Sequence, residues 1–192
     1  MSSVVISGDT SGAITLAAPA VAGTNTLTLQ AGTATNSMNT LATAVASTSG
    51  TSIDFTSIPS WVKRITVMLN GVSTNGTSII QIQLGDSGGI ETTSYSGQAW
   101  TASTNSGVVT SGLYTSVSNA AVNTLSGVVQ FVLQTGTTWI GTGVLNVTNA
   151  SNVGYQTMSV KTLSDTLTQV RITTVNGTDT FDAGSVNILY EG

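Results

Sequence analysis

The chain has no cysteine and no histidine, and only 6% of its 192 residues are charged. The absence of cysteine excludes disulfides, thiol catalysis and cysteine-ligated zinc. Without histidine, the chain lacks the side chain that most often transfers protons near neutral pH. These absences remove most common catalytic machinery. The composition therefore favours a structural or binding protein that is not an enzyme and needs no cofactor.

Positive charge is also scarce, because four Lys and Arg residues stand against eight Asp and Glu residues. Proteins that bind nucleic acid contact several phosphates through Lys and Arg, so that class is excluded. No stretch approaches the roughly 18 consecutive apolar residues of a membrane helix. The N-terminus lacks the basic and apolar regions of a secretory signal peptide. We expect neither membrane insertion nor export through such a signal.

What the chain does contain is an abundance of Ser and Thr, interleaved with Val, Ile and Leu. Residues 62–69, 79–84, 128–134, 139–147, 156–163, 167–175 and 185–190 read as short strands with a period of two. Asn70-Gly71, the stretch 135–138 and Asn176-Gly177 read as turns between them. The pattern predicts an all-β fold, an antiparallel jelly-roll-like β-sandwich.

Residues 1–50 differ from the rest, with one charged residue and no aromatic one. Alternation at 13–16 and 26–29 predicts two short strands around a turn, and residues 38–49 read as a linker. Two strands alone bury too little to be stable, so this segment should lean on another subunit or on the main domain. We expect an N-terminal segment over 1–50 and a sandwich over 51–192.

One motif resembles an active site. Gly85-Asp86-Ser87-Gly88-Gly89 matches the surroundings of the nucleophile in trypsin-like proteases. That chemistry needs a histidine base, which the chain lacks, and a lysine substitute would have to be desolvated, which nothing in the sequence indicates. The eight carboxylates are scattered and mark no facing pair of the glycosidase kind. The motif is predicted to be a glycine-rich turn.

Residues 176–184 leave two interpretations open. Asp179 and Asp182, with nearby carbonyl groups, could hold calcium, and a solvated hairpin turn explains the same residues equally well. No other metal site is predicted.

The aromatic residues divide into two groups. Trp61 and Trp139 stand at strand starts and are expected to pack in the core. Trp100, with Tyr95 and Tyr114 on either side of it in the sequence, lies in a polar Gly-, Ser- and Thr-rich region. Long polar loops that carry aromatic residues are frequent binding sites, so these three are the candidate ligand-binding residues, although packing is the more common role for aromatic residues.

Several segments resemble the virion fibre proteins of tailed bacteriophages. Residues 12–29, GAITLAAPAVAGTNTLTL, are similar to a recurring element of such proteins, with Gln30 where proline is usual. Residues 53–67, IDFTSIPSWVKRITV, resemble the start of a fibre C-terminal domain, and residues 82–89 and 182–192 continue the likeness.

The resemblance implies a homotrimeric fibre that is assembled in the host cytoplasm and exposed on the surface of the virion. Residues 1–50 would be the attachment and trimerisation segment, bound to tail, baseplate or capsid proteins. Residues 51–192 would be a terminal knob, with host-surface glycan as its expected ligand. The absence of a long shaft leaves a head fibre or a capsid decoration protein as alternatives. A free carbohydrate-binding module is the alternative outside this class.

Overall fold

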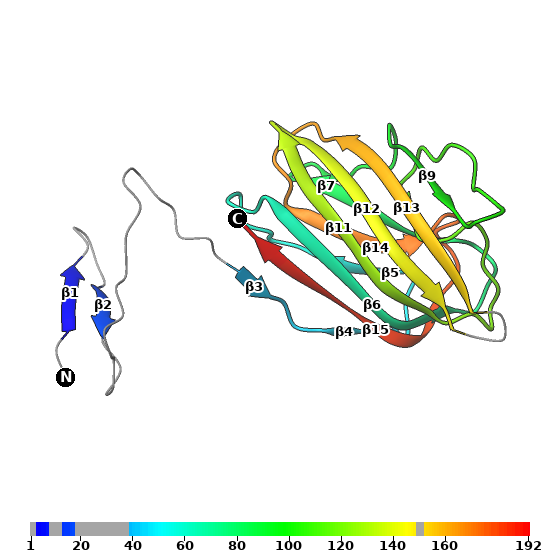
Figure 1. Ribbon diagram of the computed structural model, residues 1–192, viewed down its shortest axis with the longest axis horizontal. Coiled ribbons are helices and arrows are strands. Elements are labelled where there is room, and N and C mark those ends of the chain that lie inside the picture. Colours follow the sequence, from blue (N-terminus) through cyan, green and yellow to red (C-terminus); the bar gives the residue numbers. More distant parts are fainter. Residues whose placement is uncertain (1–2, 8–12, 18–38, 149–151) are drawn as a thin grey trace. The chain divides into compact units, whose positions relative to one another are not determined.

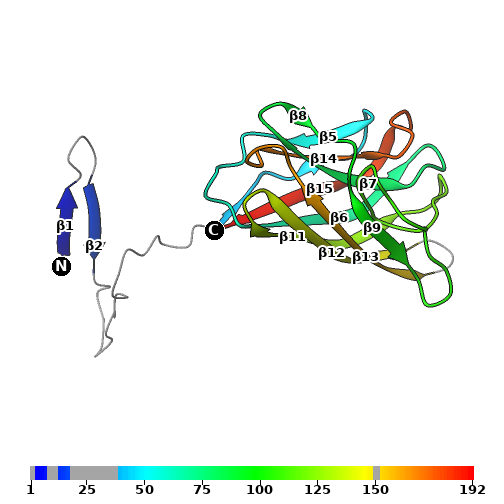
Figure 2. The same ribbon diagram turned by 90° about the horizontal axis from the view of Figure 1, so that it is seen from above.

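The computed structural model describes residues 3–7, 13–17, 39–148 and 152–192. The chain divides into two compact units, Met1–Asn36 and Ser37–Gly192. All regular elements in the described residues are β-strands, and the larger unit is a sandwich of two antiparallel sheets (Figure 2). The predicted all-β antiparallel sandwich is confirmed.

The smaller unit contains a two-stranded antiparallel sheet of β1 (Ser3–Ser7) and β2 (Ala13–Ala17), in which Val5 lies opposite Thr15. The strand predicted at 13–16 is thus present. Its partner is the N-terminal stretch that forms β1, a strand which the sequence analysis did not predict. The second strand predicted there, at 26–29, lies outside the described residues.

The larger sheet of the sandwich forms the front layer in Figure 1. Its order is β3 (Asn39–Leu41), β15 (Phe181–Glu191), β6 (Arg64–Thr74), β11 (Leu125–Thr135), β12 (Thr138–Val147), β13 (Val153–Thr162) and β9 (Ser96–Trp100), and β4 (Val45–Ala46) also pairs with β15. The strands β11, β12 and β13 follow one another as a meander.

The smaller sheet of the sandwich lies behind the larger one. Its order is β10 (Leu113–Tyr114), β7 (Ile80–Asp86), β14 (Gln169–Thr174) and β5 (Ser52–Phe55), with β8 (Gly89–Ile90) paired to β7. The core contains side chains of both sheets; the largest fully buried ones include Phe131, Phe181, Ile82, Leu84 and Ile188. Trp139 is buried as predicted, whereas Trp61 is only partly buried and packs against the core.

Two of the predicted turns are present. The β11–β12 hairpin closes between Thr135 and Thr138, where Gly136 has a φ of 53°. Gly177 has a φ of 68° in the turn after β14. Both glycines adopt the left-handed conformation that disfavours residues with a Cβ atom.

The predicted turn at Asn70-Gly71 is wrong, because β6 continues through it to Thr74. Gly71 has a φ of 63°, and the pairing of β6 with β15 shifts its register beside it. Gly184 lies opposite, so close that an added Cβ would be 2.4 Å from the Gly71 carbonyl oxygen. The Asn-Gly pair does mark a left-handed residue, but that residue serves a β-bulge within a long strand.

The expected linker over 38–49 is also corrected. Residues 39–41 and 45–46 form β3 and β4 against β15, and Ser47 is fully buried, with its hydroxyl donating to the Ala183 carbonyl at 2.7 Å. Their short, small-residue sequence gave little strand periodicity. These residues are therefore part of the compact unit that begins at Ser37.

The interior leaves no room beside Gly141 on β12. A Cβ there would lie 2.6 Å from the Phe131 ring and 2.7 Å from a Leu113 methyl group. We expect Gly141→Ala to lower the free energy of unfolding by about 1–3 kcal/mol, the usual cost of overpacking. Gly154→Ala is the matched control, because its nearest neighbour would be 4.0 Å away. Urea unfolding of both variants measures the difference, and equal stabilities would contradict this packing.

Candidate functional site

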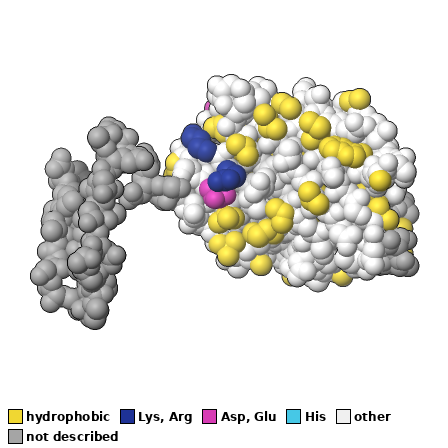
Figure 3. Space-filling model, viewed as in Figure 1, with side chains coloured by type: hydrophobic (Ala, Val, Ile, Leu, Met, Phe, Trp, Pro, Cys, Tyr) yellow, Lys and Arg dark blue, Asp and Glu magenta, His cyan; other side chains and the backbone are white. Residues whose placement is uncertain are grey.

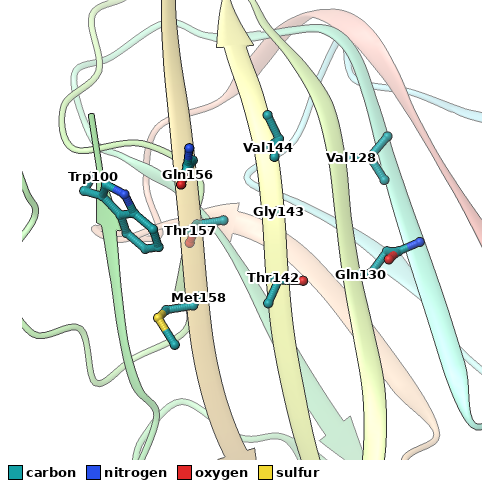
Figure 4. Close-up of a pocket in the computed structure, with 9 residues that line it drawn as sticks. All are labelled: Trp100, Val128, Gln130, Thr142, Gly143, Val144, Gln156, Thr157 and Met158. Carbon is teal, nitrogen blue, oxygen red and sulfur yellow. The ribbon is translucent and has the colours of Figure 1, made fainter. Parts of the chain in front are cut away.

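Trp100 lies on the outer side of the larger sheet, at its edge strand β9. The register places Trp100 opposite Gln156 of β13, and Gln156 opposite Val144 of β12. Because side chains alternate along a strand, Ala99 points inward and is fully buried while Trp100 points outward. Figure 4 shows the indole beside Gln156 and Met158. The sheet register therefore determines which neighbours the indole ring has.

Three hollows border Trp100, and two of them differ clearly in chemistry. One, of about 450 Å³, lies over the sheet and includes Val128, Val144 and Met158 in its lining (Figure 4). The other, of about 560 Å³, is here called the edge hollow. It is lined by Gln98, Trp100, Thr101, Ala102, Ser103, Thr104, Asn105 and Met158. The edge hollow thus combines one aromatic face with uncharged hydroxyl and amide groups.

Local hydrogen bonds give the loop of the edge hollow its shape. The Thr101 hydroxyl accepts from the backbone N–H groups of Ser103 and Thr104 at 3.3 and 3.1 Å. The Thr101 N–H donates to the Thr104 carbonyl at 2.7 Å, and the Ser106 hydroxyl accepts from the Ala99 N–H at 3.0 Å. Such turns fix the backbone without a core of their own. A neutral polyol that presents an apolar ring face fits this set of groups.

The three candidate aromatic residues do not meet at one surface. Tyr95 is 2% exposed, and its hydroxyl accepts from the Leu84 N–H at 2.7 Å. Burial raises the pKa of Tyr95 well above its ordinary value. Tyr114 is half-buried on β10, where its hydroxyl lies 3.5 Å from that of Ser111. Only Trp100 lines the two hollows.

A buried charged cluster, which the sequence analysis missed, lies beside Tyr95. Lys161 is 3% exposed; its ammonium group lies 2.5 Å from a Glu91 carboxylate oxygen and donates to the Thr93 carbonyl at 2.9 Å. It also lies 5.2 Å from the centre of the Tyr95 ring. Burial raises the pKa of Glu91, but the bonds from Lys161 and Ser164 outweigh it and hold that pKa below its usual value.

Asp86 extends this cluster to the neighbouring loop. The Ser164 hydroxyl donates to one carboxylate oxygen at 2.6 Å, and the Gly88 N–H donates to the other at 2.8 Å. Both bonds lower the pKa of Asp86, that of Ser164 most. The Ser164 N–H donates to Glu91 at 2.7 Å. The cluster therefore ties the β7–β8 hairpin to the loop that follows β13.

The protease-like motif forms the β7–β8 hairpin, with Ser87 exposed in its turn. The structure does contain a desolvated lysine, Lys161, which nothing in the sequence indicated. Its ammonium group bonds the Glu91 carboxylate and the Thr93 carbonyl. The serine that bonds the buried carboxylates is Ser164, whose hydroxyl donates to Asp86. These contacts brace two loops.

Asp179 and Asp182, the two residues considered for calcium, accept hydrogen bonds from different partners. Asp179 accepts from the Asn176 side chain at 2.6 Å and from the Ser78 N–H at 2.9 Å, and these bonds lower its pKa. Asp182 accepts a hydrogen bond from the Ser73 hydroxyl. Over the described ranges, no three acidic, histidine or cysteine side chains gather as a metal site would require. Residues 175–180 connect β14 of the smaller sheet to β15 of the larger sheet, so they form a loop between the two sheets and the expected hairpin is wrong; Asp182 lies within β15.

No protein-family model, no curated protein and no solved structure matches the chain. In the part of the chain that the structure describes, there is no helix with the length and apolar character needed to cross a bilayer.

Proposed function

We propose that the chain is a non-enzymatic structural protein of a bacteriophage particle. In this proposal it forms a trimeric fibre, assembled in the host cytoplasm, that attaches through its N-terminal segment and presents its sandwich on the particle surface. The resemblance of residues 12–29 and 53–67 to fibre proteins supports this role. The low charge also supports it, since a hydroxyl- and amide-rich surface changes little with salt or pH.

The observation that carries the proposal is the separate N-terminal unit. Its described strands form a two-stranded sheet, and a lone hairpin of this size is at best marginally stable in water. Pairing with other copies or with a particle protein would stabilise such a hairpin. The test is mass spectrometry of purified particles of the phage that encodes the chain. The full chain should be present and a chain lacking residues 1–36 absent; equal incorporation of both would contradict attachment through this unit.

Capsid decoration is the second candidate within this class. It differs from the fibre role in what its loss does to the particle. Deleting a decoration protein should lower the heat resistance of the particles and leave host range unchanged. Deleting a fibre should reduce adsorption to the host.

We further propose that the edge hollow contacts a neutral glycan of the host surface, with Trp100 stacking on a sugar ring. We expect Trp100→Ala to weaken binding of host surface polysaccharide at least about tenfold, roughly 1.4 kcal/mol, because the stacking face is lost. Trp100→Phe should retain much of the affinity. Titration calorimetry with the purified polysaccharide is the measurement, and unchanged affinity in Trp100→Ala would contradict this site.

A further inference from the structure

The outer surface of the β11–β12–β13 meander carries six exposed apolar side chains among uncharged polar ones. Here the aliphatic face means these six apolar side chains, Val128, Val132, Ile140, Val144, Met158 and Val160. All six are exposed, Val144 to 69% and Met158 to 47%. A sheet face that meets water normally carries polar side chains. The exposed aliphatic side chains therefore indicate a surface that another molecule covers.

Part of strand β13 reverses the usual arrangement, because polar residues face the core and apolar residues face the solvent. Its inward positions include Thr157, Ser159 and Lys161, all buried, while Met158 and Val160 point outward. Two of these inward polar groups have uses, since Thr157 donates to the Tyr114 carbonyl at 2.6 Å and Lys161 pairs with Glu91; the buried Ser159 hydroxyl has no hydrogen-bond partner among the described residues. Nothing within the described chain gives Met158 and Val160 a comparable role.

The aliphatic face is uncharged. The register places Arg64 and Glu191 beside Val132, at one end of the outer surface, and these two form an ion pair of 2.9 Å. Figure 3 shows the apolar groups spread over this surface and the charged groups gathered toward one end. Because burying an unpaired charge is costly, an uncharged face fits an uncharged partner.

The whole outer surface of the larger sheet, with the aliphatic face in its middle, approaches the size of a protein interface. The strands β15, β6, β11, β12, β13 and β9 lie side by side. Six strands spaced about 4.8 Å apart, over about seven residues of 3.4 Å each, span roughly 700 Å². A standard protein interface buries about 800 Å² on each partner. The outer surface of the sheet as a whole, rather than the aliphatic face alone, is therefore close to the size that a stable contact between proteins needs.

The chemistry of the surface favours contact with the same surface of other copies. Gln130, Thr142 and Gln156 lie between the aliphatic residues, and their amide and hydroxyl groups both donate and accept. Two such surfaces can thus satisfy each other without any charge. Val144 projects beside the hollow of about 450 Å³, which can receive a side chain from a neighbour (Figure 4). Sugar rings favour aromatic faces, and Trp100 borders this surface rather than lying at its centre.

We propose that the aliphatic face is the surface through which copies of this chain meet. The number of copies, three, rests on the proposed fibre. The inference adds a contact between the sandwiches of these copies, beyond any contact that the N-terminal segment makes. The edge hollow shares Met158 with the aliphatic face, but its loop residues 101–105 lie outside that face.

The test is the solution mass of the full chain and of Val144→Asp by native mass spectrometry and light scattering over a dilution series. A carboxylate buried in the contact without a partner should raise the dissociation constant at least about 30-fold. Val108→Asp is the matched control, because Val108 is 81% exposed in a loop outside the face, and its mass should equal that of the wild type. Circular dichroism verifies that each variant is folded.

Gln130→Glu provides a second variant that adds charge with almost no change of shape, and it should weaken the assembly in the same direction. A folded Val144→Asp trimer with wild-type affinity would overturn the assigned surface while leaving the fibre proposal intact. A wild-type monomer would overturn both the surface and the trimer. Loss of polysaccharide binding in Val144→Asp at unchanged mass would assign the face to glycan and overturn the inference.

Discussion

Phe131→Ala should lower the free energy of unfolding by about 3–5 kcal/mol, the range for deleting a buried aromatic ring. Phe131 is among the largest fully buried side chains and lies in the middle of β11, paired with Ile65 on one side and Gly141 on the other. Domains of this kind are stable by only about 5–15 kcal/mol, so this one change removes a large share of the total.

The measurement is urea unfolding followed by tryptophan fluorescence at constant protein concentration, since assembly would add to the apparent stability. Gly141→Ala in the Phe131→Ala background should cost less than it does alone, because the ring that it would meet is gone. A Phe131→Ala variant within 1 kcal/mol of the wild type would show that the ring is not packed between the sheets as described.

Glu91→Gln should be the most damaging conservative change at a charged residue. It keeps the shape of the side chain but leaves Lys161 buried without its carboxylate partner. Breaking a buried pair from one side costs about 3–5 kcal/mol, and we expect about 3 because Glu91 is partly accessible. Lys161→Met combined with Glu91→Gln should recover most of the loss, because no buried charge then remains.

The pH dependence follows from the same pair. The folded pKa of Glu91 lies below its usual value, so its contribution to stability is full above the unfolded pKa near 4.3 and is lost as the pH falls through the folded pKa. Unfolding measured between pH 2 and 7 should therefore show a smaller acid loss for Glu91→Gln than for the wild type. Asp86, whose pKa is also lowered, should contribute part of the acid-induced loss of stability in both proteins. Equal slopes and equal stability at neutral pH would contradict the role of the pair.

The sequence predicted the sandwich well, because the strands that pack against the core alternate with a period of two. Residues 128–134 and 139–147 lie within β11 and β12, and the turn between them is where the glycine indicated. The errors lie where local pattern and tertiary role differ. Asn70-Gly71 marks a left-handed residue, but only the pairing with β15 shows that it is a bulge.

The candidate site could be predicted only in part. Trp100 was singled out from its polar surroundings and does line the edge hollow. Tyr95, close to it in the sequence, is buried because its hydroxyl serves the backbone of β7. The burial of Lys161 could not be predicted from the sequence either, because it depends on the direction in which its side chain points from β13. In the second half of β13, Met158 and Val160 face outward while Ser159 and Lys161 face inward, so an ordinary amphipathic interpretation assigns the two faces of this half the wrong way round.

The central claim is that this chain is an assembly protein whose copies meet through the sandwich. The most direct test is the native mass of the full-length chain at micromolar concentration. The account predicts a particle of three chains of 19.4 kDa each, which separates into single folded chains when Val144 is replaced by Asp. A folded wild-type monomer of 19.4 kDa at every concentration would contradict it.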